Sequence, residues 1–199
     1  MSFKLTTKDL INTGIFGALY FAVMLLCAGI ALVPVIHMLI TPINALVAAP
    51  VFLLLIAKTQ KPFCITIVGF LCSIITGFVI YGSIVCFFVC FAFFLVAEAI
   101  AFAGKYKSMK INCLSYIVAS YWTIGVTGVF WFAKDYAAQI SSGTADEFAM
   151  ALTKGVIEIS TPETFVLVMI LTAICGFIST VFARRILRKH FKKAGIVTV

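Results

Sequence analysis

The chain has 199 residues, of which 63% are hydrophobic and 11% are charged, and its formal net charge is +8. A soluble domain carries about 25% charged residues, so this composition excludes an ordinary water-soluble fold and favours a protein that folds within the lipid bilayer. Nucleic-acid binding is also excluded, because the basic residues flank apolar runs instead of clustering in a hydrophilic patch.

Apolar runs of roughly 18 or more residues recur along the whole chain, separated by short polar breaks. They predict an all-α, polytopic membrane protein in which residues 1–199 form a single bundle of six transmembrane helices. In chain order, we expect these helices at about 9–29, 35–57, 63–80, 84–103, 111–133 and 162–186.

Two parts of this pattern depart from straight, closely connected helices. Pro42 and Pro50 lie inside the second range, so this helix is expected to be kinked or broken. The segment 134–161 is the one long connection, and residues 145–158 within it are mildly amphipathic. We expect this stretch to lie on the outer mouth of the bundle.

The distribution of charge predicts the orientation in the membrane. Of the 15 Lys and Arg residues, only Lys134 and Lys154 lie in or near the breaks on one side, and all the others lie at the two ends of the chain or in the breaks on the opposite side. Five of the seven acidic residues gather around the long connection. The positive-inside rule then places both termini in the cytoplasm.

A face of small residues runs along the first predicted helix. Gly14, Ala18 and Ala22 recur every four residues, and Gly17 lies beside them. Small residues let a neighbouring helix approach closely within lipid. Two interpretations remain open: packing inside this bundle, or a docking face for a partner protein.

Glu98 is the only acidic residue inside an apolar run, and an intramembrane charge is a functional candidate by default. It lies about two helical turns from Lys105, near the expected cytoplasmic interface. A pairing with lysine or a side chain that reaches the interface is one interpretation. Contact with a cytoplasmic partner is the other, and a ligand site is the least favoured.

Polar and aromatic side chains on the outer half of the expected bundle are candidates for binding a small solute. They are His37, Asn44, Tyr121, Trp122, Trp131 and Lys134. A pocket for a flat organic solute needs rings and a few polar groups. The alternatives are an interfacial histidine, an asparagine bonded to a neighbouring helix, and an aromatic belt at the outer end of the fifth helix.

Catalysis and metal binding find no support in the motifs. The seven cysteines lie mostly in apolar runs without CxxC spacing, and we interpret them as packing residues. The chain has no HExxH and no Walker A motif. We therefore expect no metal site, no cofactor and no enzymatic activity, including ATP hydrolysis.

Several stretches together resemble a known family. They are KDL at 8–10, ALYFA at 18–22, AEAI at 97–100, GKYKS at 104–108, SYWTIG at 120–125 and RRILRKHFKKAG at 184–195. In these residues the chain resembles the substrate-binding S-components of energy-coupling factor (ECF) transporters, and among them the MptD-like or Trep_Strep group. The resemblance spans essentially the whole chain.

The resemblance implies a transport subunit in the plasma membrane of a prokaryote. S-components bind a micronutrient at the outer face and associate with a transmembrane coupling subunit and two cytoplasmic ATPases. By the same resemblance, Ala18 and Ala22 would contact the coupling subunit, with Gly14 as an extension of that face. The residues themselves also allow a membrane scaffold or assembly protein without a ligand. The identity of the solute stays open. The aromatic rings favour a flat heterocycle, whereas Lys134 would accept an anion and the acidic outer loop would favour a cation.

Overall fold

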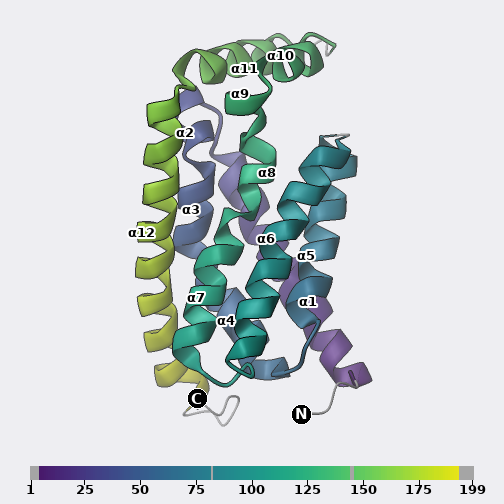
Figure 1. Ribbon diagram of the computed structural model, residues 1–199, viewed down its shortest axis with the longest axis vertical. Coiled ribbons are helices and arrows are strands. Elements are labelled where there is room, and N and C mark those ends of the chain that lie inside the picture. The colour runs from purple at the N-terminus through teal and green to yellow at the C-terminus, as the bar shows by residue number, and fades with distance from the viewer. Residues whose placement is uncertain (1–4, 82, 144–145, 193–199) are drawn as a thin grey trace.

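The structure is a computed structural model that describes residues 5–81, 83–143 and 146–192, with side chains up to residue 189, and all regular structure in these ranges is helical. Lys4, Lys192 and Lys193, which contribute to the charge asymmetry, lie outside the described side chains. Most helices stand side by side in a bundle, and two lie across one end of it (Figure 1). We call that end the outer end.

Three uninterrupted helices are long and apolar enough to cross a membrane, and they occupy the first, fourth and sixth of the predicted ranges. They are α1 (Thr7–Gly29), α6 (Ile84–Ala103) and α12 (Pro162–Ile186), the last continuing as the π-helical η3 (Leu187–Lys192). Thr6 and Thr161 begin the first and last of them with capping boxes.

The second predicted helix is broken into three pieces. These are α2 (Pro34–Met38), α3 (Ile40–Val47) and α4 (Ala49–Thr59). The axes of α3 and α4 differ by 48°, and the pair together is apolar enough for one bent span. Pro50 stands in the first turn of α4, where its missing N–H is tolerated, and the Tyr116 hydroxyl donates to the Ala45 carbonyl just before the bend at 2.7 Å.

The third and fifth predicted helices are also irregular. The third consists of α5 (Cys64–Ile74) and the π-helical η1 (Ile75–Ile80), and the fifth of α7 (Met109–Ala119), the 3-10 helix η2 (Ser120–Thr123), α8 (Ile124–Thr127) and α9 (Val129–Phe132). Hydroxyl side chains at Ser120, Thr123 and Thr127 compete with the helical pattern by bonding locally or to α3. The described residues thus contain three candidate spans, or four with the bent pair.

The two helices across the outer end are α10 (Lys134–Ser142) and α11 (Glu147–Ile159) (Figure 1). Part of the amphipathic stretch expected at 145–158 lies outside the described residues, and the rest forms α11. It packs on α2 through Gly155, where an added Cβ would lie 2.6 Å from Pro34 Cγ. Glycine at this position therefore permits the close contact between the transverse helix and the bundle.

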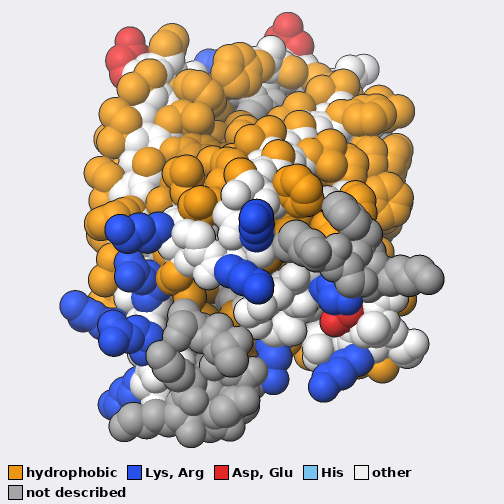
Figure 2. All heavy atoms as spheres, turned by 60° about the horizontal axis from the view of Figure 1, so that its bottom comes forward, with side chains coloured by type: hydrophobic (Ala, Val, Ile, Leu, Met, Phe, Trp, Pro, Cys, Tyr) orange, Lys and Arg blue, Asp and Glu red, His pale blue; other side chains and the backbone are white. Residues whose placement is uncertain are grey.

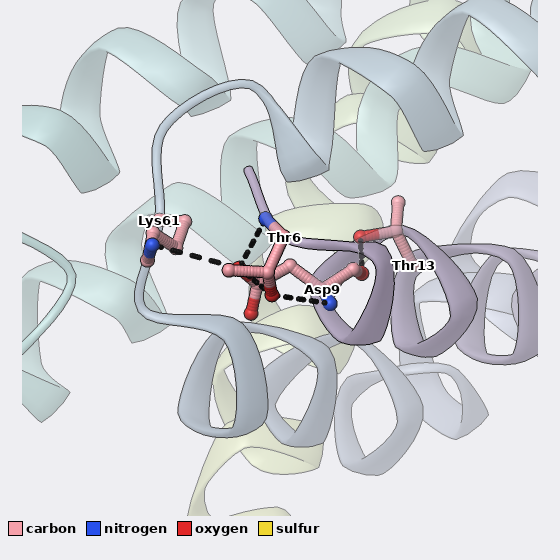
Figure 3. A network of polar contacts seen from close by, with 4 residues as sticks. All are labelled: Thr6, Asp9, Thr13 and Lys61. Atoms are coloured by element: carbon pink, nitrogen blue, oxygen red, sulfur yellow. Dashed lines mark hydrogen bonds and ion pairs between the residues drawn. The ribbon is translucent and has the colours of Figure 1, made fainter. Parts of the chain in front are cut away.

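The opposite end, which we call the basic end, is formed by the start of α1, the connections α4–α5 and α6–α7, and the end of α12. Lys and Arg side chains are spread over it (Figure 2). At its edge, the capping pair Thr6 and Asp9 begins α1, and Lys61 from the α4–α5 connection forms an ion pair with Asp9 at 3.5 Å (Figure 3). Thr13 also donates to the Asp9 carbonyl at 2.8 Å.

Glu98 joins the connections of the basic end from inside the bundle. Its carboxylate accepts hydrogen bonds from the backbone N–H groups of Phe63 (3.1 Å) and Thr66 (2.9 Å), the Thr66 hydroxyl and the Tyr106 hydroxyl. The side chain is 9% exposed. It thus caps the positive N-terminal end of α5, and these contacts, not a lysine, are the partners that the structure gives it.

Tyr106 completes this junction. It lies in the α6–α7 connection with a left-handed backbone (φ 59°), and the Asn112 amide donates to its carbonyl at 3.1 Å. Burial, followed by the hydrogen bond to Glu98, raises the pKa of the Tyr106 phenol, so the hydroxyl remains protonated and keeps donating.

Replacing Glu98 with alanine is expected to lower the free energy of unfolding by about 2–4 kcal/mol, because buried donors of Phe63, Thr66 and Tyr106 lose their acceptor. Thermal unfolding of the detergent-solubilised protein, followed by tryptophan fluorescence, measures this. The control is Glu158→Ala on the exposed side of α11, expected to stay within about 0.5 kcal/mol. Equal effects of both variants would contradict the capping role.

Candidate functional site

The structure does not bring the six predicted solute-binding residues together in one pocket. His37, Trp131 and Lys134 lie near the outer end, whereas Asn44 and Trp122 are fully buried in the bundle. Tyr121 is partly buried beside α12, where its hydroxyl donates to the Met169 carbonyl at 2.7 Å. No observation tests a binding role for the six, and each stays a prediction.

The three residues near the outer end all have protein partners. Trp131 donates to the Thr164 hydroxyl at 3.2 Å, and Lys134 donates to the Ser160 carbonyl at 2.6 Å at the end of α11. The His37 ring packs edge-on against Phe130, with centroids 5.5 Å apart. The Trp131 and His37 contacts join α9 to α12 and to α2, and the Lys134 contact joins the start of α10 to the end of α11. Trp131 and Lys134 also line an open pocket of about 410 Å³ beside the start of α12.

The middle of the bundle holds a group of buried polar side chains. We call the following five residues, each with a buried side-chain atom outside the hydrogen bonds of the bundle, the central polar set: Tyr20, Asn44, Ser73, Thr76 and Trp122. The Tyr20 hydroxyl and the Trp122 side chain lie within reach of each other, so Asn44, Ser73 and Thr76 carry the atoms that the protein leaves without a partner. They come from α1, α3, α5, η1 and η2 and are at most 1% exposed. Most buried polar groups in proteins are hydrogen-bonded, so this concentration requires an explanation.

Two further residues among those described carry such atoms. They are Asn112 and Ser179, on α7 and α12.

The central polar set lies directly beneath a small cavity, which we call the chamber. Its volume is about 70 Å³, and its lining includes Met24, Ile40, Thr76, Thr123 and Val126. Thr76 belongs to both. The other four members of the set each lie within about one helical turn of a lining residue, in every case toward the basic end. Only Thr76 of the set lines the chamber; the other four are packed in the bundle on its basic-end side.

Aromatic rings surround the Trp122 indole. Its ring centroid lies 5.5 Å from that of Phe94 and 6.3 Å from that of Tyr20, which in turn packs on Phe52 at 5.9 Å. The sequence analysis selected Trp122 and Asn44, but it missed Tyr20, Ser73 and Thr76. Single polar residues in apolar helices were the available signal, and the sequence alone does not place them at one level.

A chain of threonine hydroxyls lies beside the chamber, and Thr123 is its member that lines the cavity. Thr123 donates to Thr41 at 3.0 Å, and Thr127 lies 3.5 Å from the same Thr41 hydroxyl. These contacts hold the irregular η2–α8 segment against α3. The spacing of Thr123 and Thr127 by four residues places them on one helical face, which is the signal in the sequence.

A larger groove lies on the other side of α8. Its volume is about 620 Å³, and side chains of α6, α8, α9 and the start of α10 line it, among them Cys86, Ile124, Gly125, Phe132 and Tyr136. Its lining includes none of the six predicted residues. It is almost entirely apolar, so it offers little to orient a polar solute.

The small-residue face of α1 points away from the bundle. Gly14, Ala18 and Ala22 are exposed, and a Cβ at Gly14 would meet no atom within 4 Å. Gly17 lies on the other face and packs against Val68. The three residues therefore contribute little to packing within the described bundle, and the face is available to another helix.

Metal-ligating residues do not converge within the described ranges, where no group of three His, Cys, Asp or Glu side chains could hold an ion. Cys86 and Cys90 approach with their sulfur atoms 4.0 Å apart, one turn apart on α6.

Comparison with known proteins adds the family. A model of a hypothetical bacterial integral membrane protein family, Trep_Strep, matches residues 7–193. The chain belongs to the Trep_Strep family. No curated protein and no solved structure matches it. The family consists of integral membrane proteins, which explains why large apolar side chains lie on the outside of this Trep_Strep protein. Leu26, Val79 and Phe132, for example, are more than 70% exposed.

Replacing Lys134 with methionine is expected to loosen the attachment of α11 in the Trep_Strep chain, because the carbonyls at the end of that helix lose a charged donor. Amide hydrogen exchange over 156–161 should become about tenfold faster, which corresponds to about 1.4 kcal/mol of local stability. Lys154→Met, on the exposed side of α11, is the control and should change little. Unchanged exchange in Lys134→Met would show that the contact does not hold the helix.

Proposed function

We propose that this Trep_Strep protein is the substrate-specificity subunit of an ECF-type uptake transporter, which binds a vitamin-like micronutrient at its outer side. The observation that carries the proposal is the central polar set beneath the chamber. A buried donor or acceptor without a partner destabilises the fold by about 1–3 kcal/mol. A solute that supplied the missing partners would explain why Asn44, Ser73 and Thr76 share one level of a membrane bundle.

The proposed topology has six membrane crossings with both termini in the cytoplasm of a prokaryotic cell. The three long helices and the bent α3–α4 pair support four of these crossings, and in the proposal the apolar segments at 64–80 and 109–132 provide the other two. Figure 1 shows how these elements stand side by side in the bundle. The basic end faces the cytoplasm by the positive-inside rule. The chamber then lies in the half of the bundle nearer the outer surface.

The proposed partners are a transmembrane coupling subunit and two cytoplasmic ATPases. The exposed face of Gly14, Ala18 and Ala22 supports the first, since small residues permit close helix contact in lipid. The chain has no Walker A motif, so ATP hydrolysis is assigned to the partners and no catalysis to this subunit. The rigid basic end would lie beside the ATPases.

A membrane scaffold without a small-molecule ligand is the second candidate. The exposed face of α1 and the lysines and arginines of the basic end favour it, because both suit contacts with proteins and lipid headgroups. The scaffold interpretation does not explain the central polar set. Saturable binding of a small molecule separates the two candidates.

The topology predicts opposite accessibility for two exposed positions. With Gln139→Cys on α10, a membrane-impermeant maleimide should label intact cells. With Lys107→Cys in the α6–α7 connection, labelling should require permeabilised cells. The unaltered chain, with its seven native cysteines, gives the background. Labelling of both positions from the same side would contradict the topology.

The docking face predicts the effect of a bulky residue at Ala18. Ala18→Trp should reduce co-purification of the coupling subunit and the ATPases by about tenfold or more, because the ring prevents close helix contact. Affinity purification from native membranes with quantitative mass spectrometry measures this. Ala99→Trp makes the same change at an exposed position of α6 and should leave recovery unchanged. Intact assembly with Ala18→Trp would exclude this face.

A further inference from the structure

We infer that the groove between α6 and α8–α9 holds one alkyl chain of a phospholipid from the leaflet at the outer end, with the lipid headgroup beside Tyr136. The inference goes beyond the proposed function and does not depend on it, because it rests on a different site from the chamber. Three observations lead to it: how the helices create the groove, what lines it, and where it opens in the membrane.

The groove is a fork between two helices that touch near its floor. Gly125 of α8 lies against α6, where an added Cβ would be 2.4 Å from the Cys90 sulfur and 2.8 Å from the Cys90 nitrogen. Beyond this contact, toward the outer end, α6 and α8–α9 stand apart (Figure 1), and the groove between them has a volume of about 620 Å³. Cys86 and Ile124 are the recessed lining residues, only 3% and 8% exposed. Close packing at Gly125 thus gives the groove a closed floor below an open mouth.

The lining of the groove selects an apolar occupant. The described residues that line it include no Asp, Glu, Lys, Arg or His, and their side-chain hydroxyls are those of Ser83 and Tyr136, both at the outer end. Ser83 already accepts a hydrogen bond from the Cys86 N–H at 3.3 Å, as the N-cap of α6. A polar solute would lose its hydrogen bonds to water in this groove without gaining others, which costs free energy. An alkyl chain has no such bonds to lose.

The position of the groove in the membrane identifies the lipid as the source of that chain. Family membership places the bundle in a bilayer, and the rim of the groove carries Ile84, Val85 and Phe132, each more than half exposed. The mouth therefore opens sideways into hydrocarbon. Tyr136 lies at the outer limit of the groove, on the transverse helix α10, and tyrosine is typical of the headgroup level. A lipid chain in the groove would thus keep its headgroup at the level where headgroups already lie.

The dimensions of the groove fit one chain and exclude a helix. Its lining on α8–α9 extends from Ile124 to Phe132, which is about 12 Å along a helix, and one leaflet of the hydrocarbon core is about 15 Å deep. A transmembrane helix of about 10 Å diameter would occupy about 900 Å³ over the same length. The groove, with about 620 Å³, is too small for a partner's helix to enter. An extended alkyl chain, which is much thinner, can lie along the whole groove.

The test maps where a lipid chain touches the protein. The purified full-length chain is reconstituted in phosphatidylcholine vesicles in which part of the lipid carries a photoreactive diazirine at the middle of one acyl chain. After illumination, labelled residues are located by mass spectrometry of proteolytic peptides. Val129→Trp fills the groove from the α8–α9 wall, and Val79→Trp, at an exposed position of η1 outside the groove, is the matched control. Val89→Trp fills the groove from the α6 wall and decides the test if Val129→Trp does not fold.

The expected result is labelling of the recessed residues Cys86 and Ile124 in the wild type and in Val79→Trp. In Val129→Trp, labelling of this recessed pair should fall by about tenfold or more, because the indole takes the space of the chain. Labelling of Phe177, which is exposed on α12 far from the groove in sequence, should stay the same in all variants. Native mass spectrometry from mild detergent should show one retained phospholipid on the wild type and none on Val129→Trp.

Three results overturn the inference. Labelling confined to exposed side chains, with Cys86 and Ile124 unlabelled, would show that lipid only surrounds the bundle. Equal labelling of this pair in the wild type and in Val129→Trp would show that the label does not arrive through the groove. A non-lipid compound or a polypeptide retained in place of the phospholipid would assign the groove to another occupant. The vesicles contain no coupling subunit and no ATPase, so each result is read separately from the proposed transporter assembly.

Discussion

The constraint on which this structure depends is that lipid offers no hydrogen-bond partners. Every polar group within the bundle must be satisfied by the protein itself or by something the protein binds. The described chain meets this for its backbone by being helical throughout, and for Glu98 by surrounding one carboxylate with four donors. The same demand makes the exceptions informative. A buried polar atom that the protein leaves without a partner needs an ordered water or a bound molecule to satisfy it.

Regular and irregular helices are distributed according to this demand. The uninterrupted helices α1, α6 and α12 carry few polar residues in their middle turns, and they give the bundle its length. The breaks fall in α2–α4, η1 and η2–α9, and these segments meet around the chamber. A break in a helix leaves backbone groups without their helical partners, and side chains of neighbouring helices can bond to them. At the α3–α4 bend, the Tyr116 hydroxyl donates to the Ala45 carbonyl. The irregular segments thus bring polar groups to the interior, which continuous apolar helices exclude.

Much of the fold could be predicted from the sequence, because hydrophobic length and charge asymmetry are direct consequences of the bilayer. The predicted range 84–103 coincides with α6, and Pro42 and Pro50 correctly predicted that the second helix is broken. The interruption at Ser120–Thr123 was not predicted, since its cause is a hydroxyl contact with Thr41, 82 residues away. Glu98 shows the same limit. Its lysine neighbour in sequence suggested an ion pair, whereas the folded chain presents it with the N-terminus of α5.

The candidate site could be predicted only in part, for a related reason. A mid-span tryptophan stands out in a sequence, and Trp122 was selected on that ground. Tyr20, Ser73 and Thr76 are individually ordinary in apolar helices, and only the folded bundle shows that they share one level. Conversely, Trp131 and Lys134 were selected for their chemistry, and in the fold their polar atoms join α9 to α12 and the start of α10 to the end of α11.

Helix α1 joins the interior of the bundle to the proposed docking face, and this has a mechanical consequence. Tyr20 packs on Phe52 and Trp122 inside the bundle, while Ala18 and Ala22 face away from it on the same helix. An uninterrupted helix of 23 residues transmits a shift of Tyr20 to that exposed face. At the basic end, the Asp9–Lys61 ion pair restrains the start of α1 (Figure 3). A change in the packing around Tyr20 would therefore reach a partner docked on Ala18 through α1 itself, with the ion pair at the basic end limiting the movement of the helix start.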